Sequence, residues 1–509
     1  GAREQRAEAM EEESRETRSA GGPTGRVVVR EAEAPAVAPE AFLRAFDGMV
    51  RGFWEREGRW AAWAGQVARL ELPRGDGRDL ARKVVRWRRA LGPEAGGRCF
   101  GGCAFDVRAP GGSADPPSAG WSRWPGVLFV LPAVELRRAA GRTRLVVRAG
   151  GPEGAPEEAA RSAADRAVDR VRRRLEGLDE TAPDVDAPDV DDPGGGDPGG
   201  DEERPPAVRR RPDRAGWRDL VRAGLDAIGA GGVEKVVPAR LLELETRRPP
   251  SPVRLLRRLR ADNPGTFPFL VEAEPGTALV GAAPEIVASR RGECFMATAV
   301  AGTVPEGEDE EETRRLARRL RESAKDRAEH ELTVRDMREA LVSVAGVARV
   351  GREPDVLRLR GMQHLITRLT AKMPDRPHVL ELLEALHPTA AVNGYPREPA
   401  GDFLRRREPF DRGWFAGPVG WFDQAGDGTF APALRCALVE DRGVRLFAGA
   451  GVVQGSRPDD EWRETAMKLR PVLRALGRED ALREGRTAGR GAADGGGVAG
   501  PDAAGRVGD

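Results

Sequence analysis

The pattern of apolar and polar residues divides the chain into two structured sections and three polar segments. Apolar positions recur with the periods of strands and helices over 26–177 and 215–476. Residues 1–25, 178–214 and 477–509 are rich in charged residues, glycine and proline, as disordered tails and linkers are. We therefore expect a folded body in two sections, joined by a linker insertion and flanked by two disordered tails.

Short apolar runs and helical spacing predict the elements of both sections. In the first section we expect a helix over 41–46 and strands at 26–30, 98–106, 124–132 and 142–148. In the second we expect helices over 217–228 and 309–342, and strands at 233–240, 268–271 and 278–282. Strands outnumber helices and their connections are short, which favours antiparallel pairing.

A last helix is predicted after the glycine-rich strand that ends near 455. Ser456 is the expected N-cap and Pro458 lies near the first helical position. Glu461, Glu464 and Lys468 follow at i, i+3 and i+7, so they share one face of this helix. An apolar stripe is formed by Trp462, Ala466, Leu469, Leu473 and Leu476. The charged face could hold a divalent cation with an acidic ligand, or it could be an ordinary solvated surface.

The composition narrows the functional classes. Lys plus Arg total 83 and Asp plus Glu total 82, a balance that favours neither nucleic acid nor a membrane surface as partner. Four cysteines in 509 residues argue against a disulfide framework and fit a reducing compartment. Neither an 18-residue apolar run nor the apolar segment of a signal peptide is present. We therefore expect a cytoplasmic enzyme.

Six short motifs carry the candidate chemistry. In chain order they are Lys235-Val-Val-x-Ala-Arg, Pro284-Glu285, Ala301-Gly302-Thr303, Lys325-Asp326-x-x-Glu329-His330, His387-Pro-Thr and Glu461-Trp-x-Glu464-Thr-x-x-Lys468. The run 298–303 is expected to end a strand, with exposed backbone N–H groups suited to a carboxylate.

In this order the motifs resemble the chorismate-utilising enzymes and, within them, the isochorismate synthases. The resemblance covers 215–476 and extends more weakly to 26–150. It implies an α/β (α+β) body, in which two large antiparallel β-sheets face each other and helices pack outside. The implied reaction adds water at ring C2 of chorismate while the C4 hydroxyl leaves. That reaction needs a base, an acid and cationic groups that hold two carboxylates.

The resemblance assigns the two catalytic roles to Lys235 and Glu285. Lys235 matches the general base, whose neutral form must be accessible, so burial or a cationic neighbour is expected around it. The alternative is a solvated lysine at a strand edge. Glu285 matches the general acid, for which a raised pKa is expected. The alternative is a turn carboxylate that caps a backbone N–H group.

The resemblance also implies a Mg²⁺ ion and a set of substrate-binding groups. Glu329 and Glu464 match metal ligands, and Glu461 matches a ligand that acts directly or through water. The residues that match substrate-binding positions are Ala301, Gly302, Thr303, His364, Arg435, Gly449 and Lys468. For His364, a core histidine bonded to the backbone remains an equal alternative.

Several functions stay open at this point. The leading one is a Mg²⁺-dependent isochorismate synthase, for menaquinone synthesis or for a salicylate-type siderophore. A salicylate synthase, an aminating synthase with a glutaminase partner and a catalytically inactive chorismate-binding scaffold are the alternatives. For the leading function we expect a monomer without a glutaminase subunit, and neither nucleic acid nor membrane as partner.

Overall fold

The computed structural model of the chain describes residues 27–107, 119–150, 157–176, 178, 207–346 and 348–483. The predicted tail at 1–25, most of the predicted linker and the chain beyond 483 lie outside these residues. Two predicted boundaries are corrected. Within the predicted linker, Val208–Arg211 forms strand β7, because it pairs with β9 (Ala239–Glu245). Beyond 476, Glu479–Leu482 forms the short 3-10 helix η3, and its Ala481 is buried.

Nineteen strands of the described residues form one hydrogen-bonded network in which every pair is antiparallel. One half of the network is a sheet of β14 (Arg349–Val350), β15 (Asp355–Leu359), β16 (Met362–Lys372), β13 (Cys294–Pro305), β12 (Ala288–Arg291), β19 (Gly428–Pro432), β18 (Pro418–Phe422) and β4 (Cys99–Cys103). Both β14 and β15 pair with β16.

The other half is a sheet of β1 (Val27–Glu33), β6 (Arg142–Gly150), β2 (Arg51–Arg56), β10 (Phe267–Glu274), β11 (Thr277–Ala283), β20 (Cys436–Glu440), β21 (Gly443–Gly449), β9 and β7. The long strands β3 (Arg59–Leu72) and β5 (Val127–Ala139) join the two halves. β5 pairs with β4 over 127–130 and with β6 over 134–139. The β3–β5 register shifts between Gln66 and Ala68, where the two sheets meet.

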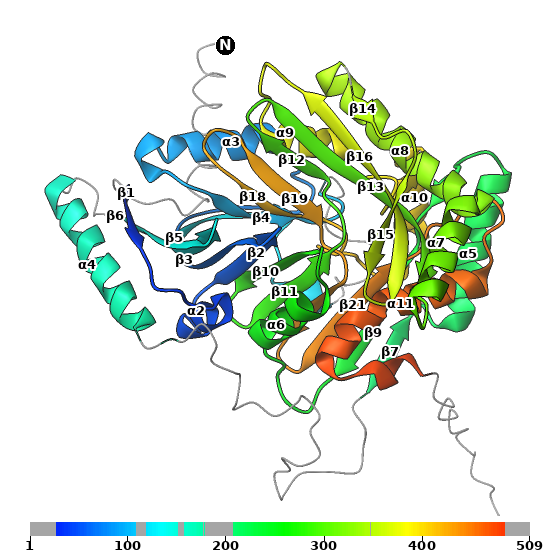
Figure 1. Cartoon of the computed structure of the whole chain (residues 1–509), viewed down its shortest axis with the longest axis horizontal. Coiled ribbons are helices and arrows are strands. Elements are labelled where there is room, and N and C mark those ends of the chain that lie inside the picture. Colours follow the sequence, from blue (N-terminus) through cyan, green and yellow to red (C-terminus); the bar gives the residue numbers. More distant parts are fainter. Residues whose placement is uncertain are drawn as a thin grey trace, which may run out of the picture.

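The two sheets face each other across a shared core. Trp63 and Phe269 of one half pack with Phe100 and Val419 of the other. A second core lies under α2 (Pro39–Ala45), α4 (Glu157–Leu175), α6 (Pro252–Asp262) and α11 (Pro458–Leu476). A third lies under α3 (Leu80–Ala90), α8 (Ala324–Ala345) and α9 (Val379–Leu386). Figure 1 shows these helices at the outside of the sheets. The expected fold, facing antiparallel sheets with helices outside, is confirmed.

The remaining elements are the helices α5 (Arg214–Gly229), α7 (Glu310–Glu322) and α10 (Arg397–Arg407), the 3-10 turns η1 (Pro93–Ala95) and η2 (Ala119–Trp121), and the strands β8 (Lys235–Val236) and β17 (Gly394–Tyr395). None of the described helices combines the length and the apolar character needed to cross a membrane.

The strand predicted at 233–240 is divided into two pieces. β8 pairs with β17 in a separate two-stranded sheet, whereas β9 begins at Ala239 and joins the main network. Pro238 lies between them and has no N–H to donate to a ladder, and the N–H of Val237 donates to Asn393. Lys235 therefore stands on a short strand outside the main sheets.

The helix predicted over 309–342 is also divided. α7 ends and α8 begins at Ser323, whose side chain accepts a hydrogen bond from the N–H of Asp326. Serine at this position caps the new helix and replaces the bonds that a continuous helix would make. The prediction missed this break because the apolar spacing continues across it.

The N-cap predicted for the last helix is wrong by one residue. Arg457 occupies the N-cap of α11 without a side-chain capping bond, and Pro458 is the first helical residue, as expected. Ser456 instead accepts a hydrogen bond from the N–H of Val453 in the preceding turn.

Candidate active site

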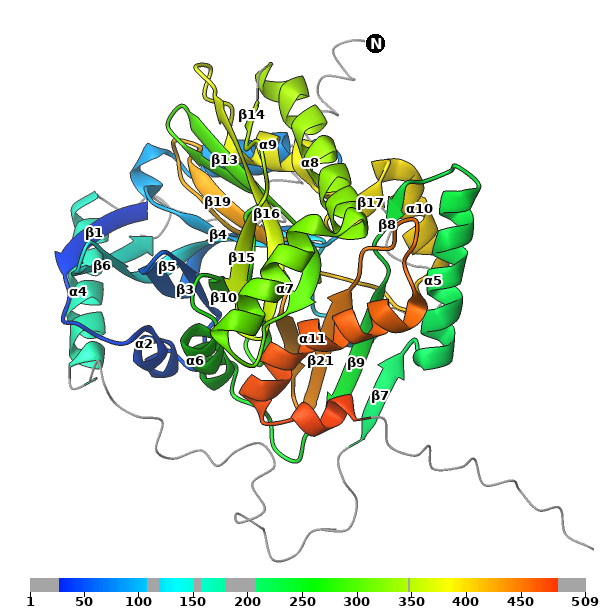
Figure 2. The ribbon, with the colours of Figure 1, turned by 45° about the vertical axis from the view of Figure 1, so that its right-hand side comes forward.

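Apart from the His387-Pro-Thr motif, where His387 contacts the carbonyl of Phe105, the candidate residues converge where α8 and α11 both contact β13; Figure 2 shows these elements. β8 supplies Lys235, and the segment between β11 and β12 supplies Glu285. β16 supplies His364, and the segment between β19 and β20 supplies Arg435. The remaining predicted residues lie on β13, β21, α8 and α11. Segments separated by more than two hundred residues thus form a single cluster.

Three glutamates of the cluster each pair with a lysine. Glu329 Oε1 lies 3.1 Å from Lys235 Nζ, and Glu464 Oε1 lies 2.6 Å from Lys468 Nζ. Glu461 Oε1 lies 2.6 Å from the Nζ atom of Lys325. Glu461 is 1% exposed, so the charged face of α11 is not a solvated surface. Lys325 was part of a motif but had no predicted role, and the structure brings it into the cluster.

Lys235 is fully buried, which excludes the interpretation as a solvated strand-edge lysine. Its Nζ contacts Glu329 and the hydroxyl of Thr333, which lies 3.1 Å away. Gly451 provides the room for this contact. A β-carbon at 451 would collide with Glu329 Oε1 and lie 3.0 Å from Lys235 Cε. Sequence reasoning assigned no role to Thr333 or Gly451, because only the fold brings them to the lysine.

Glu285 is buried, and its Oε2 atom has no hydrogen-bond partner among the described residues. Burial raises the pKa of this carboxyl to about 7, and the charges of Arg435, Lys235 and Lys468 oppose that rise only in part. This confirms the raised pKa that was expected. At neutral pH a large fraction of the Glu285 side chains therefore carries a proton.

The neighbouring carboxyls respond differently to burial. Burial alone would raise the pKa of Glu329, but the nearby lysines, Lys235 first, outweigh it and lower that pKa. For Glu461, burial and then the charge of Glu464 raise the pKa to about 7, although Lys325 opposes them. Glu329 is thus ionised at neutral pH, whereas the carboxyl of Glu461 carries a proton in a large fraction of the molecules.

Arg435, His364 and Thr303 form a hydrogen-bonded chain. Burial lowers the pKa of His364 well below its ordinary value, so the ring is neutral. Arg435 Nη2 lies 3.1 Å from Nε2, and a guanidinium can only donate. The ring proton therefore sits on Nδ1, which donates to the carbonyl of Gly302 at 3.1 Å. Thr303 Oγ1 lies 3.1 Å from the same Nδ1 and donates to Glu464.

The ring of His364 contacts the backbone, as one interpretation expected, and it also contacts a buried arginine, whereas its contact with substrate stays a prediction. Arg435 Nε is buried and has no partner among the described residues. Burial lowers the pKa of Arg435 to about 10, which leaves it cationic at neutral pH. An unpaired cationic N–H group in this position is suited to an acidic ligand.

The expected strand end at 298–303 is wrong. Ala301, Gly302 and Thr303 lie within β13, which continues to Pro305 and pairs with β16. The register shifts between Ala301 and Thr303, and Gly302 takes a φ of +73°. This bulge, rather than a free strand end, turns the Thr303 hydroxyl toward Glu464. Lys468, which pairs with the same Glu464 oxygen, donates to the carbonyl of Gly449 at 3.0 Å.

The carboxylates of the cluster fit a hydrated magnesium ion better than a closed metal site. Within the described ranges, no group of three or more His, Cys, Asp or Glu side chains forms a ready metal cage. Glu461 nevertheless keeps one buried oxygen without a partner, and Glu464 and Glu329 both repel its charge. Oxygen donors with few direct protein ligands are what Mg²⁺ prefers.

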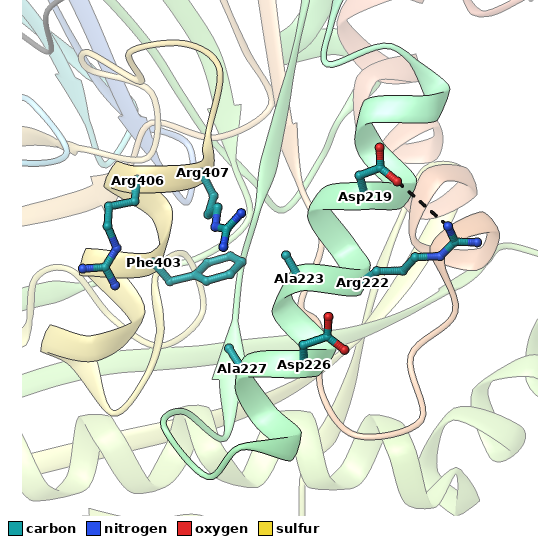
Figure 3. A pocket seen from close by; sticks show the side chains of 8 residues that line it. All are labelled: Asp219, Arg222, Ala223, Asp226, Ala227, Phe403, Arg406 and Arg407. Carbon is teal, nitrogen blue, oxygen red and sulfur yellow. Dashed lines mark ion pairs between the residues drawn. The ribbon is translucent and has the colours of Figure 1, made fainter.

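A cavity of about 470 Å³ lies elsewhere, between α5 and α10 (Figure 3). Phe403 and Arg407 of α10 face Ala223 of α5 in this view. Its lining consists of Asp219, Arg222, Ala223, Asp226, Ala227, Phe403, Arg406 and Arg407. None of these residues belongs to the predicted site, so this cavity and the charged cluster are separate features.

Comparison with known proteins identifies relatives by sequence and by structure. Isochorismate synthase DhbC of Bacillus subtilis is 39% identical over 274 residues, which are 52% of this chain and 69% of that protein. Isochorismate synthase MenF of the same organism is 36% identical over 267 residues, 52% of this chain but only 56% of that protein. These alignments therefore span about half of this chain.

Solved structures extend the likeness over more of the chain. The menaquinone-specific isochorismate synthase MenF of Escherichia coli superposes with a TM-score of 0.72 at 26% identity, covering 91% of this chain and 96% of that one. Anthranilate synthase component I of Streptococcus pneumoniae, at 19% identity and a TM-score of 0.62 over 88% of this chain and 92% of that one, shares the fold. Residues 26–477 match the family described as chorismate binding enzyme, and the chain belongs to that family.

Proposed function

We propose that the protein is an isochorismate synthase, an isomerase that adds water at C2 of chorismate and releases the C4 hydroxyl. One observation carries the proposal. Lys235, which is fully buried, and Glu285, a buried carboxyl with a pKa of about 7, belong to the same charged cluster. A base and an acid held in one buried site are what the reaction needs. The relatives named isochorismate synthase support the same activity.

In this proposal Lys235 is the base and Glu285 is the acid. Neutral Lys235 takes one proton from the attacking water, whose oxygen bonds to C2 as the ring double bonds shift. Glu285 gives its proton to the C4 oxygen as the C4–O bond breaks, so one water enters and one leaves. Glu329 stabilises the lysine cation that forms, because its carboxylate lies 3.1 Å from Nζ.

We assign the substrate carboxylates to the cationic side of the cluster. Arg435 offers a buried N–H group that has no partner in the described part of the chain, and Lys468 offers an ammonium group beside Gly449. His364 aims the guanidinium through Nε2. The bulge at 301–303 supplies the Thr303 hydroxyl on the same side.

The proposal includes a magnesium ion held by Glu329 and Glu464, with Glu461 as a direct or water-mediated ligand. A bound Mg²⁺ would neutralise carboxylate charge next to the ring. The buried positions of these glutamates, and an oxygen of Glu461 that has no partner among the residues described, support this assignment.

The decisive experiment incubates the pure protein with chorismate and Mg²⁺ and without an ammonia donor. Isochorismate as the sole product is expected. Salicylate with pyruvate would identify a salicylate synthase, and turnover only with ammonia an aminating enzyme. Chorismate binding without turnover would leave the inactive scaffold. Lys235→Ala is expected to abolish turnover while chorismate binding largely survives, and normal activity in that variant would refute the base assignment.

For the pathway we propose menaquinone synthesis, with a siderophore as the second candidate. The coverage of 91% of the chain by the menaquinone-specific enzyme of E. coli supports the first. The salicylate biosynthesis isochorismate synthase of Pseudomonas aeruginosa, 39% identical over 269 residues, or 52% of this chain and 55% of that protein, supports the second. Restoration of menaquinone in a mutant that lacks its own menaquinone-specific isochorismate synthase is the test. We further propose a cytoplasmic monomer without a glutaminase subunit, which light scattering and co-purification can check.

A further inference from the structure

We propose that Thr333 is a positioning residue that fixes the direction of the lone pair of Lys235. The inference rests on the proposed function, in which Lys235 is the base. No motif of the sequence contains Thr333, and it reaches the site only through the packing of α8 against β13.

Thr333 lies on the face of α8 that lines the site. Lys325, Glu329 and Thr333 follow at intervals of four residues, so their side chains stand one above another. Thr333 is fully buried, and its Oγ1 lies 3.1 Å from Lys235 Nζ. The hydroxyl therefore meets the lysine in the interior of the protein.

The direction of the hydrogen bond between the two side chains is determined by a third group. Thr333 Oγ1 also donates its proton to the backbone carbonyl of Glu329 at 3.2 Å, the usual bond of a helical threonine to residue i−4. A hydroxyl has one proton, so it can only accept from Lys235. Thr333 therefore presents a lone pair to Nζ, and the amine must direct an N–H toward it.

Two acceptors are enough to orient a neutral amine. The neutral group has two N–H bonds and one lone pair in three staggered positions. The two N–H bonds point to Thr333 Oγ1 and Glu329 Oε1, both 3.1 Å away. The lone pair is left in the third position, away from both oxygens.

Loss of the Thr333 hydroxyl leaves the direction of the Lys235 lone pair undetermined. Without the hydroxyl, the amine of Lys235 can rotate so that its lone pair faces the side chain at position 333. One N–H group still donates to Glu329 after this rotation, so that hydrogen bond does not prevent it. An N–H group left facing a methyl is buried and unpaired, so the wrong arrangement becomes the preferred one. The cost of one unpaired buried donor corresponds to roughly a tenfold fall in kcat.

The test compares Thr333→Val and Thr333→Ser in the full chain with chorismate and Mg²⁺. Valine keeps the volume but not the hydroxyl, and we expect kcat to fall roughly tenfold with KM nearly unchanged. Serine keeps the hydroxyl, and we expect it to restore kcat to within about threefold of the wild type. As a control, Thr313→Val changes another buried helical threonine, which accepts from Gly307 away from the cluster, and should leave kcat and KM unaltered.

Three results would overturn the inference. They are an unchanged kcat in Thr333→Val, a loss that Thr333→Ser does not repair, and a rise in KM that accounts for the whole loss. In each case the wild type still forms isochorismate, so the proposed function stands. A wild type that forms no isochorismate refutes the proposed function, and the role of Thr333 in that reaction falls with it. The urea midpoint of each variant shows whether it is folded.

Discussion

Replacing Glu285 by glutamine should remove activity and, at alkaline pH, stabilise the fold. Glutamine has nearly the same shape as glutamate but cannot donate the proton that the proposed acid gives to the C4 oxygen. Removal of a general acid costs about 10²–10⁴ in rate, so we expect kcat to fall at least about a hundredfold. The wild-type kcat should itself decrease as the pH rises through about 7, where Glu285 loses its proton.

The effect on stability follows from the difference between the pKa of Glu285 in the folded state and its pKa in the unfolded state. Its pKa is 4.5 in the ordinary case and about 7 in the folded protein, because the side chain is buried. Below pH 4.5 both states are protonated. Between pH 4.5 and 7 the unfolded state releases the proton that the folded state keeps, so the free energy of unfolding falls as the pH rises. Above that range the loss is complete and amounts to about 3 kcal/mol.

Glutamine has no proton to lose, so the variant escapes this penalty. Urea unfolding of both proteins, at a pH near 4.5 and at one above 8, measures the difference. On going from the lower to the higher pH, the free energy of unfolding of Glu285→Gln should rise by up to about 3 kcal/mol relative to that of the wild type. Glu274→Gln, an exposed glutamate at the end of β10, is the matched control and should show little change. If the free energies of unfolding of the wild type and Glu285→Gln differ by the same amount at both pH values, burial does not raise the pKa of Glu285.

Three further predictions test the geometry of the site. Gly451→Ala should lower kcat at least about tenfold, because the added β-carbon would collide with Glu329. Gly229→Ala is the control and should leave kcat unchanged, because an added β-carbon there meets no other atom. Equal kinetics of the two variants would contradict the close packing of Gly451 against Glu329. His364→Ala should raise KM roughly tenfold by freeing the guanidinium of Arg435, with kcat less affected, and an unaltered KM would remove His364 from substrate binding. Chelation of divalent ions should abolish turnover and added Mg²⁺ should restore it, so full turnover after chelation would exclude the proposed metal.

Much of the fold was readable from local patterns. The apolar stripe of α11, the proline that begins it and the run of acids in its first turn depend on residues within one or two turns. The two failures in helix boundaries, at Ser323 and Ser456, were choices between capping geometries that neighbouring segments decide. The predicted strand is divided at Pro238, and the partners of its two pieces are distant: Val236 of β8 pairs with Gly394 of β17, 158 positions later, and β9 pairs with β21.

The sequence by itself determined the approximate positions of the predicted helices and strands, the family resemblance and the residue types of the site, because these depend on neighbours along the chain. It could not decide which lysine meets which glutamate. Lys325 pairs with Glu461 across 136 positions, and Lys235 meets Thr333 across 98. Burial, which raises the pKa of Glu285 and keeps His364 neutral, also exists only once the sheets and helices have packed. The tertiary structure decided the charges, the pairings and the directions of the hydrogen bonds, since each is set by groups that the chain brings together from a distance.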